Sequence, residues 1–338
     1  MGAPGSVHAS KGSAPTAFIA KLHSMVGGPS EAGQATSPRS YSSGYDRRRL
    51  STYLELLRHY RKNRQFAARH YEIFCRVRQA FERHGQLPVE QADILDIGCG
   101  QRFPLTLLFH SIGAQSIGID YDHIEPDPTW HSLLTIVKRN GIERAVKTLL
   151  RHTLFDRAYY RCLGELLGRP LRFSGIRLQM MDATALQFPD QRFHYACSSD
   201  VFEHIADVEG ATRELARILR PGGIAYIGIN VFPGISGGHH LEWAEPDTRP
   251  SRRVPPWDHL RQNLFPSSSY LNRLRESDYL RIFRSHFAII DLQTVYQGEA
   301  QLTDDIAREL SIYSRHELLQ GALTVILRKS EKTAAATF

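Results

Sequence analysis

The stretch Ile94-Leu95-Asp96-Ile97-Gly98-Cys99-Gly100-Gln101-Arg102-Phe103-Pro104 decides the fold of this chain. Its apolar first part, Ile94–Ile97, predicts a short buried strand. Gly98 and Gly100 predict a tight turn, because glycine permits backbone torsions and a close ligand approach that a Cβ would block. Pro104 predicts the first residue of a helix, where a missing N–H leaves no hydrogen bond unmade. We therefore expect a parallel α/β sheet with its ligand crevice at the carboxyl end of this strand.

Four later stretches have the apolar character of buried strands, and acids end the first three. Asp120 follows the glycine turn by about twenty residues, a spacing at which a carboxylate can accept hydrogen bonds from ribose hydroxyls. The four stretches are Ser116–Tyr121, Ile176–Ala183, Phe193–Asp200 and Ala216–Asn230, the last with a turn at Leu219–Gly223 between a helix and its strand.

With these motifs in this order, the chain resembles the class I S-adenosylmethionine-dependent methyltransferases over roughly residues 91–232. The resemblance implies a Rossmann-like, seven-stranded, mostly parallel sheet flanked by helices. Phe287–Leu292 and Leu323–Arg328 would supply its last two strands as an antiparallel pair, with one or two helices in Thr303–Leu319 between them. The chain departs from the dinucleotide fingerprint at Phe103, which stands where a third glycine is usual.

The resemblance also implies S-adenosylmethionine as the cofactor and assigns residues to its parts. Asp96 would meet the amino group of the amino-acid tail, and Asp120 would accept both ribose hydroxyls. Tyr121 would pack on the adenine, and Asp182 would accept its amino group. The cofactor-binding residues predicted in this way are Asp96, Gly98, Cys99, Gly100, Asp120, Tyr121, Asp182, Ala183, Ser198 and Ser199, the two serines facing the methyl-transfer crevice.

Residues 232–272 follow the predicted fifth strand and therefore emerge beside the same crevice. Their glycines, paired histidines and tryptophans predict a mobile, aromatic-lined substrate loop, in which Trp243 and Trp257 stack on the acceptor. Methyl transfer to a hydroxyl needs a base to remove its proton, and histidine suits that task near neutral pH. The predicted catalytic residues are His239 and His240 of this loop, then His204 of the Glu203-His204 pair, with His259 as the next candidate.

No metal site is predicted from the sequence. His239, His240 and Glu242 offer the right donor types, but adjacent histidines point in different directions in a strand or loop. Cys75, Cys99, Cys162 and Cys197 are far apart and lack metal-ligand spacing. Disulfides and structural zinc are therefore not expected, and a cytoplasmic location fits best. No apolar run approaches the ~20 residues that span a bilayer.

The 338 residues divide by composition into several regions. Residues 1–45 are rich in Gly, Ser, Ala and Pro and predict a disordered tail. Residues 46–90 predict a helical extension, and residues 91–330 predict the methyltransferase domain. Within that domain, residues 123–175 are too long for a simple crossover and predict an inserted helical cap. Residues 331–338 should fray.

The helical extension is basic, with eleven Lys and Arg against five Asp and Glu. One interpretation is an amphipathic helix or two packed across the sheet edge with solvated arginines. The alternative is a patch that meets an anionic substrate or the surface of a membrane.

The residues directly after the fourth strand bear on the nature of the acceptor. Ser198-Ser199-Asp200-Val201 lacks the Asn/Asp-Pro-Pro-aromatic sequence of amino-directed nucleic-acid methyltransferases, which disfavours nucleic acid despite the formal charge of +7. Gln101–Pro104 and His239–Trp243 look more like methyltransferases of bacterial glycan or secondary-metabolite pathways. We therefore expect O-methylation of a carbohydrate or another small-molecule acceptor. The alternatives are an RNA or protein methyltransferase, or a non-catalytic binding or scaffold subunit with this fold.

Overall fold

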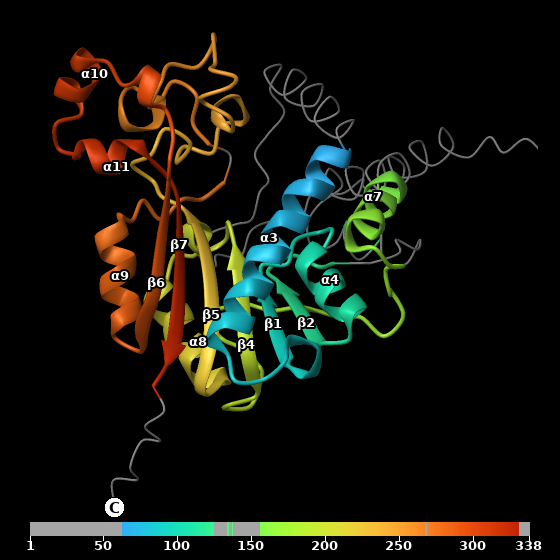
Figure 1. Ribbon diagram of the computed structural model, residues 1–338. Helices are drawn as coiled ribbons and strands as arrows, with labels where there is room; N and C mark the ends of the chain where they lie inside the picture. Colours follow the sequence, from blue (N-terminus) through green and yellow to red (C-terminus); the bar gives the residue numbers. More distant parts are fainter. Residues whose placement is uncertain (1–62, 125–133, 135–136, 138–155, 268, 331–338) are drawn as a thin grey trace, which may run out of the picture. The chain divides into compact units, whose positions relative to one another are not determined.

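The computed structural model describes residues 63–124, 134, 137, 156–267 and 269–330 (Figure 1). The predicted disordered tail, residues 46–62 of the helical extension, most of the predicted cap and the predicted frayed end at 331–338 lie outside the described residues. Within the described part of the chain, no helix combines the length and the apolar character needed to cross a membrane.

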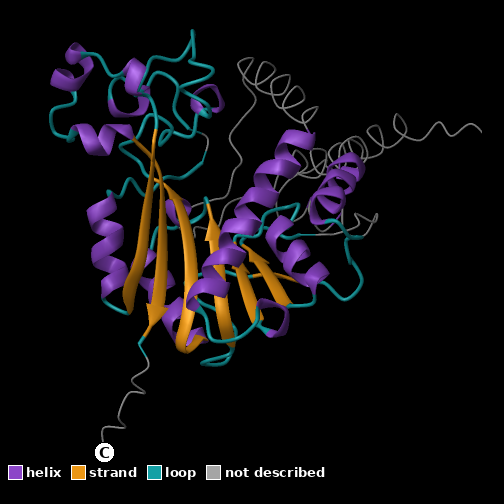
Figure 2. Ribbon diagram, in the orientation of Figure 1, coloured by secondary structure: helices purple, strands orange, loops and turns teal. Residues whose placement is uncertain are grey.

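A single seven-stranded sheet carries the structure, with strand order β3-β2-β1-β4-β5-β7-β6 (Figures 1 and 2). The first five strands pair in parallel, and β7 is antiparallel to both β5 and β6. This confirms the predicted mostly parallel sheet and its antiparallel last pair. The strands are β1 (Asp93–Ile97), β2 (Gln115–Asp120), β3 (Arg177–Met180), β4 (Phe193–Ser199), β5 (Leu219–Asn230), β6 (Phe287–Tyr296) and β7 (Gln320–Lys329).

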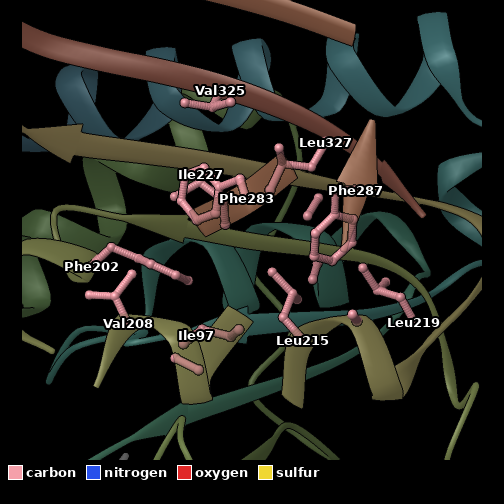
Figure 3. Close-up of a cluster of buried hydrophobic side chains, with 14 of the residues drawn as sticks. Ile97, Phe202, Val208, Leu215, Leu219, Ile227, Phe283, Phe287, Val325 and Leu327 are labelled. Carbon is pink, nitrogen blue, oxygen red and sulfur yellow. The ribbon is translucent and has the colours of Figure 1, made fainter. Parts of the chain in front are cut away.

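Helices cover both faces of the sheet. On one face, α3 (Asn63–His84), α4 (Pro104–Ile112) and α7 (Arg157–Leu167) bury one hydrophobic cluster with the strands. On the other face, α8 (Val208–Ile218) and α9 (Glu276–Arg284) bury a second cluster, part of which Figure 3 shows. Because parallel strands are covered on both faces, most residues of β1, β4 and β5 are buried, in runs such as Ile94–Ile97 and Ile224–Ile227.

The glycine turn and α4 form as the sequence predicts. Pro104 begins α4, and Phe103 before it has a left-handed backbone (φ 37°) at the place where a third glycine was missing. A left-handed backbone is unusual for a bulky residue and costs energy. Burial of the Phe103 ring, which is 1% exposed and packs with Cys99, Leu107 and Ile124, offsets that cost.

Helix α3 lies across the middle of the sheet face, so the predicted position at the sheet edge was wrong. Phe81 of α3 stacks on Tyr195 of the central strand β4 with ring centroids 4.6 Å apart. Phe74 meets Phe109 of α4 edge-on at 4.9 Å. The apolar face of α3 therefore covers the central strands, while Arg64, Arg69 and other basic side chains remain exposed. The packing of α3 is that of an amphipathic helix, and contact of its basic side chains with an anionic partner stays a prediction.

Residues 231–267 and 297–319 fold together into a lobe at the end of β5 and the start of β7, and we call it the helical lobe (Figure 1). It contains η4 (Leu241–Trp243), η5 (Asp258–Leu260), η6 (Glu299–Gln301), α10 (Asp304–Glu309) and α11 (Arg315–Leu319). Its own hydrophobic cluster contains Ile235, Trp243, Val254, Trp257, Leu302, Leu310, Leu318 and Leu319.

The expectation of an aromatic-lined substrate loop was wrong for both tryptophans. Trp243 is 1% exposed and Trp257 is fully buried, and the Trp257 Nε1–H donates to the Leu318 carbonyl at 3.1 Å. The rings form the core of the helical lobe because residues 297–319 supply apolar partners for them. Neither ring has a face free to stack on an acceptor.

Replacing Trp257 with Ala should destabilise the protein by about 3–5 kcal/mol, because a large buried ring is removed from a packed core. The free energy of unfolding in urea measures this effect. Ile312→Ala is a suitable control, since Ile312 is 72% exposed and its truncation should cost far less. Equal stability of Trp257→Ala and the wild type would contradict a core role for this ring.

Candidate active site

A cavity of about 480 Å³ lies at the carboxyl ends of β1 and β4, where the fold is expected to bind a ligand. Its volume lies within the range of small-molecule sites. Gly98 to Gly100 line it from the glycine turn, and Ser199 and Asp200 line it from the end of β4. Helix α3 lines the opposite side with Phe66, Arg69, His70 and Ile73.

The glycine turn has the open backbone that a closely bound ligand requires. Gly98 and Gly100 have φ values of 71° and 68°, which favour glycine. A Cβ on Gly98 would lie 2.2 Å from Val201, so this position is closed by packing. A Cβ on Gly100 would meet nothing within 4 Å and would occupy space beside the cavity. The backbone at Gly100 is therefore accessible to a ligand, and Cys99 between the two glycines lines the cavity while it is 5% exposed.

Asp96 lines the cavity and also ties β1 to α4. It is 2% exposed, and its Oδ2 accepts the backbone N–H and the hydroxyl of Thr106 at 3.0 and 2.6 Å. Burial raises the pKa of Asp96 to about 6, although the Thr106 hydrogen bonds favour the charged form. The predicted carboxylate is therefore present at the cavity, with its other oxygen near Cys197 Sγ (3.8 Å).

Asp120 ends β2 and holds the glycine turn. Its Oδ2 accepts the Gly100 N–H at 2.9 Å, and its Oδ1 accepts the Asp122 N–H at 2.9 Å. The neighbouring Tyr121 is 58% exposed, which leaves its ring accessible. Asp120, the predicted ribose-binding carboxylate, thus lies next to the Gly100 backbone, which was predicted to contact the same cofactor.

Asp182 lies just after β3, which pairs with β2, and is exposed. Its Oδ1 accepts the N–H and the hydroxyl of Thr184 at 2.8 and 2.7 Å, and Ala183 between them is half-buried. Because the Met181 N–H donates to the Asp120 carbonyl at 2.8 Å, the ends of β2 and β3 are held together. Asp120, Asp182 and Ala183 thus share one edge of the sheet, outside the residues that line the cavity.

The two serines of β4 differ in position. Ser199 lines the cavity, as expected. Ser198 is fully buried, and its hydroxyl donates to the Ile97 carbonyl at 3.0 Å. The alternation of side chains along a strand places adjacent residues on opposite faces, so both serines cannot face the crevice.

The cavity residues on α3 were missed by the sequence reasoning. The Arg69 guanidinium lies 3.8 Å from Asp200 Oδ2 across the cavity. His70 Nδ1 lies 2.7 Å from the Tyr159 hydroxyl of α7, and burial lowers the pKa of His70 to about 4. The periodicity and basic charge of this segment predicted its helix, but no sequence signal located it over the glycine turn.

Glu203, His204 and His239 form a cluster beyond Asp200. Each offers one ligand-type atom, and these three atoms lie within 4.8 Å of one another. His239 Nε2 is 3.6 Å from Glu203 Oε1, and the His204 and His239 rings meet edge-on with centroids 4.7 Å apart. His204 ends the turn η3 (Phe202–His204), four residues before α8 begins.

Burial controls the protonation of this cluster. Burial, with a smaller contribution from the nearby Asp200 carboxylate, raises the pKa of Glu203 to about 8. It lowers the pKa of His239 to about 4, with a smaller contribution from His204. It also lowers the pKa of His204. Both imidazoles are consequently neutral near pH 7 and carry a lone pair that can accept a proton or bind a cation.

His240 and His259 belong to the helical lobe. Burial lowers the pKa of His240, against the charges of Asp258 and Glu242 in the same lobe. His259 Nε2 donates to the Phe232 carbonyl at 2.9 Å. Glu242 binds Arg253 Nε at 2.6 Å, as well as the Ser251 hydroxyl. The adjacent histidines therefore diverge as expected, and only His239 joins Glu203 and His204.

Comparison with known proteins finds a family model described as a methyltransferase domain, which matches residues 60–279. An uncharacterized methyltransferase of Mycolicibacterium vanbaalenii is 28% identical over 148 residues, 44% of this chain and 43% of that protein. Another, from Mycobacterium sp. (strain JLS), is 34% identical over 77 residues, 23% of this chain and 31% of that protein. The chain thus spans less than half the length of these curated relatives.

Solved structures with a similar chain include two described as S-adenosylmethionine-dependent methyltransferases. The putative enzyme from Listeria monocytogenes has a TM-score of 0.44 at 13% identity, covering 78% of this chain and all of that one. The enzyme from Mesorhizobium loti has a TM-score of 0.41 at 21% identity, covering 72% of this chain and 94% of that one.

The buried Asp96 should make stability fall as the pH rises. Its pKa is about 6 in the folded protein, against 3.8 for an unperturbed aspartate, so the folded state holds the proton more tightly. Asp96 therefore makes its full favourable contribution to the free energy of unfolding below about pH 4. That contribution, about 2–3 kcal/mol, is lost as the pH rises through about 6. Urea unfolding from pH 4 to 7 should therefore show the wild type losing stability relative to Asp96→Asn, whose side chain does not titrate. A pH-independent difference between the two proteins would contradict the raised pKa.

Proposed function

The chain belongs to the methyltransferase-domain family, and on that premise we propose that it transfers the methyl group of S-adenosylmethionine to a hydroxyl of a carbohydrate or another small-molecule acceptor. The family and the strand order confirm the predicted class I fold and its cofactor. The acceptor, the methylated oxygen and the roles of individual residues are our proposal.

One observation carries the proposal: the cavity at the glycine turn ends at Asp200, which adjoins Glu203 and His204. Asp200 lines the cavity, and its charge acts on the pKa of both Glu203 and His204. A ligand bound at Gly100 and an acceptor held at the Glu203–His204–His239 cluster would therefore be neighbours. Proximity of two reactants is the main contribution that an enzyme makes to a displacement at carbon.

The residues in and beside the cavity fit the cofactor. The open side of Gly100 admits close contact with a ligand, and the Asp120 carboxylate beside it can accept hydroxyl hydrogen bonds. Asp96 supplies a carboxylate for an amino group, and Arg69 on α3 can meet a carboxylate. Bound S-adenosylmethionine supplies a methyl group on a sulfonium, which is already a good leaving group. The protein has to align the acceptor and remove its proton.

The proton would pass to His239 or His204. Both imidazoles are neutral near pH 7, because burial lowers their pKa values. His239 Nε2 is directed toward Glu203 Oε1 at 3.6 Å, a partner that can stabilise the imidazolium when Glu203 is ionised. His240 does not join the Glu203–His204–His239 cluster, so we assign it no part in proton removal.

An exposed aromatic surface for a sugar or another small acceptor remains at Tyr270. Its side chain is 49% exposed, and its carbonyl accepts the His204 Nδ1–H at 2.8 Å. The backbone of Tyr270 therefore contacts the cluster, whereas Trp243 and Trp257 are buried in the core of the helical lobe. Stacking on an aromatic face together with hydrogen bonds from histidine suits a hydroxyl-rich acceptor.

Cofactor binding tests the first half of the proposal. Calorimetric titration of the wild type with S-adenosylmethionine should show one site. Asp120→Ala removes the proposed ribose acceptor and should weaken binding by about 1–3 kcal/mol, since ribose hydroxyls would lose their partner. Asp304→Asn on the exposed first turn of α10 is a matched acidic control and should bind as the wild type does. Absence of binding by the wild type would overturn the proposal, and equal binding by Asp120→Ala would remove Asp120 from the site.

Methyl transfer tests the second half. Candidate glycans and metabolites are incubated with the protein and labelled S-adenosylmethionine, and products heavier by one methyl group are sought by mass spectrometry. His239→Ala should lower turnover of an identified acceptor about 10²–10⁴-fold while the affinity for the cofactor stays nearly unchanged. Full turnover in both His239→Ala and His204→Ala would exclude these histidines from the reaction.

A further inference from the structure

The Glu203–His204–His239 cluster contains buried polar atoms that lack protein partners. Glu203 is 3% exposed, and among the described residues neither its Oε2 nor the His239 Nε2 has a hydrogen-bond partner. A buried polar atom without a partner is costly and is rare in native proteins. Two such atoms on facing side chains indicate that a group outside the described chain completes the cluster.

Hydrogen bonds hold the Glu203 carboxylate and the His204 ring of this cluster in place. The Asn230 N–H donates to Glu203 Oε1 at 3.2 Å, which sets the carboxylate plane. His204 Nδ1 donates to the Tyr270 carbonyl at 2.8 Å, because a carbonyl can only accept, and this leaves the lone pair on Nε2. A second ring nitrogen fixed by a carbonyl is the usual arrangement of a metal-binding histidine.

Backbone strain at the cluster also favours a ligand-binding role. His239 has a left-handed backbone (φ 55°), and Asp200 on the other side of Glu203 has one as well (φ 58°). Neither residue is glycine, so each conformation costs energy and needs support from its surroundings. For His239, the strained backbone presents its ring to Glu203 and His204, whereas the neighbouring His240 is not part of the cluster.

We propose that Glu203, His204 Nε2 and His239 Nε2 bind one divalent transition-metal ion. Two imidazoles and one carboxylate are the donor set of catalytic zinc and non-haem iron sites, which keep at least one coordination position open. The separation of 3.6 Å between His239 Nε2 and Glu203 Oε1 is close to the roughly 3.3 Å between two tetrahedral ligands with bonds of about 2.0 Å. The three atoms already lie within 4.8 Å of one another, so small side-chain rotations complete the set.

The catalytic role of the metal ion rests on the proposed methyltransferase function, whereas binding of the ion to the cluster does not depend on that function. Coordination would place positive charge against the buried Glu203 carboxylate and would give the unpartnered His239 Nε2 a partner. An acceptor hydroxyl on the open position would lose its proton to solvent water more readily, as water does on bound zinc. The two histidines would then be ligands, and the ion would take over the activation otherwise assigned to a histidine base.

The test uses the untagged full-length protein, first stripped of metal with a chelator and dialysed. Titration calorimetry with Zn²⁺ should show one ion per chain, and Co²⁺ should produce visible absorption bands of a protein-bound site. Saturating Zn²⁺ should also raise the melting temperature, because the ion binds the folded state. Glu203→Gln and His239→Gln, which keep side-chain size and polarity, should each weaken Zn²⁺ binding at least tenfold and abolish the rise in melting temperature.

His286→Ala is the matched control, since His286 is exposed at the turn between α9 and β6 and should leave Zn²⁺ binding unchanged. Absence of stoichiometric binding by the wild type would overturn the proposal, and so would undiminished binding by both cluster variants. Binding of Mg²⁺ without Zn²⁺ or Co²⁺ would overturn the assignment to a transition metal. S-adenosylmethionine titration of the same samples separates the two proposals, because cofactor binding without metal binding would leave the proposed function standing.

Discussion

The buried carboxylate of Asp96 is the interaction on which the site depends. It receives two hydrogen bonds from Thr106 and so fixes the end of β1 against the first turn of α4, which sets the path of the glycine turn between them. Asp120 holds the same turn from β2 through the Gly100 N–H. Two acids on adjacent strands thus shape one loop, and their charges also face any ligand that the loop binds. Burial of Asp96 disfavours its charged form, as the raised pKa indicates, and this opposes the stabilisation that its hydrogen bonds give to the turn.

Features that are unfavourable to folding, namely left-handed backbones and a buried carboxylate, are concentrated around the site. Phe103, Asp200 and His239 all have left-handed backbones, and Glu203 buries a carboxylate beside the Asp200 charge. The sheet makes these arrangements stable, because large hydrophobic clusters on both of its faces hold the strands in place. Figure 3 shows the cluster beneath α8 and α9. Strain and poorly compensated polar groups persist in proteins only where the surrounding structure over-determines them, and they gather where ligands bind.

The site is assembled from parts that are far apart in the sequence. Helix α3 precedes the sheet, yet its Arg69 faces Asp200 at the end of β4. His239 comes from the helical lobe, whose stability rests on residues 297–319 packing around Trp257. The lobe therefore couples the C-terminal part of the chain to the cluster at η3, and a change in its core would displace a histidine of the site.

Local sequence determined the strands, the glycine turn, the start of α4, and the acids Asp96 within β1 and Asp120 at the end of β2, because their signals are apolar runs, glycine torsions and fixed spacings along the chain. It also identified His204 and His239 as candidates by residue type. Tertiary structure alone decided that α3 covers the cavity, that Ser198 is buried, that both tryptophans are core residues and that His239 rather than His240 meets Glu203. These outcomes depend on contacts between segments distant in the chain, and periodicity or composition within one segment carries no information about its partner. The packing of Trp243 and Trp257 against residues 297–319, and the contact of His239 with Glu203, form only when the chain has folded.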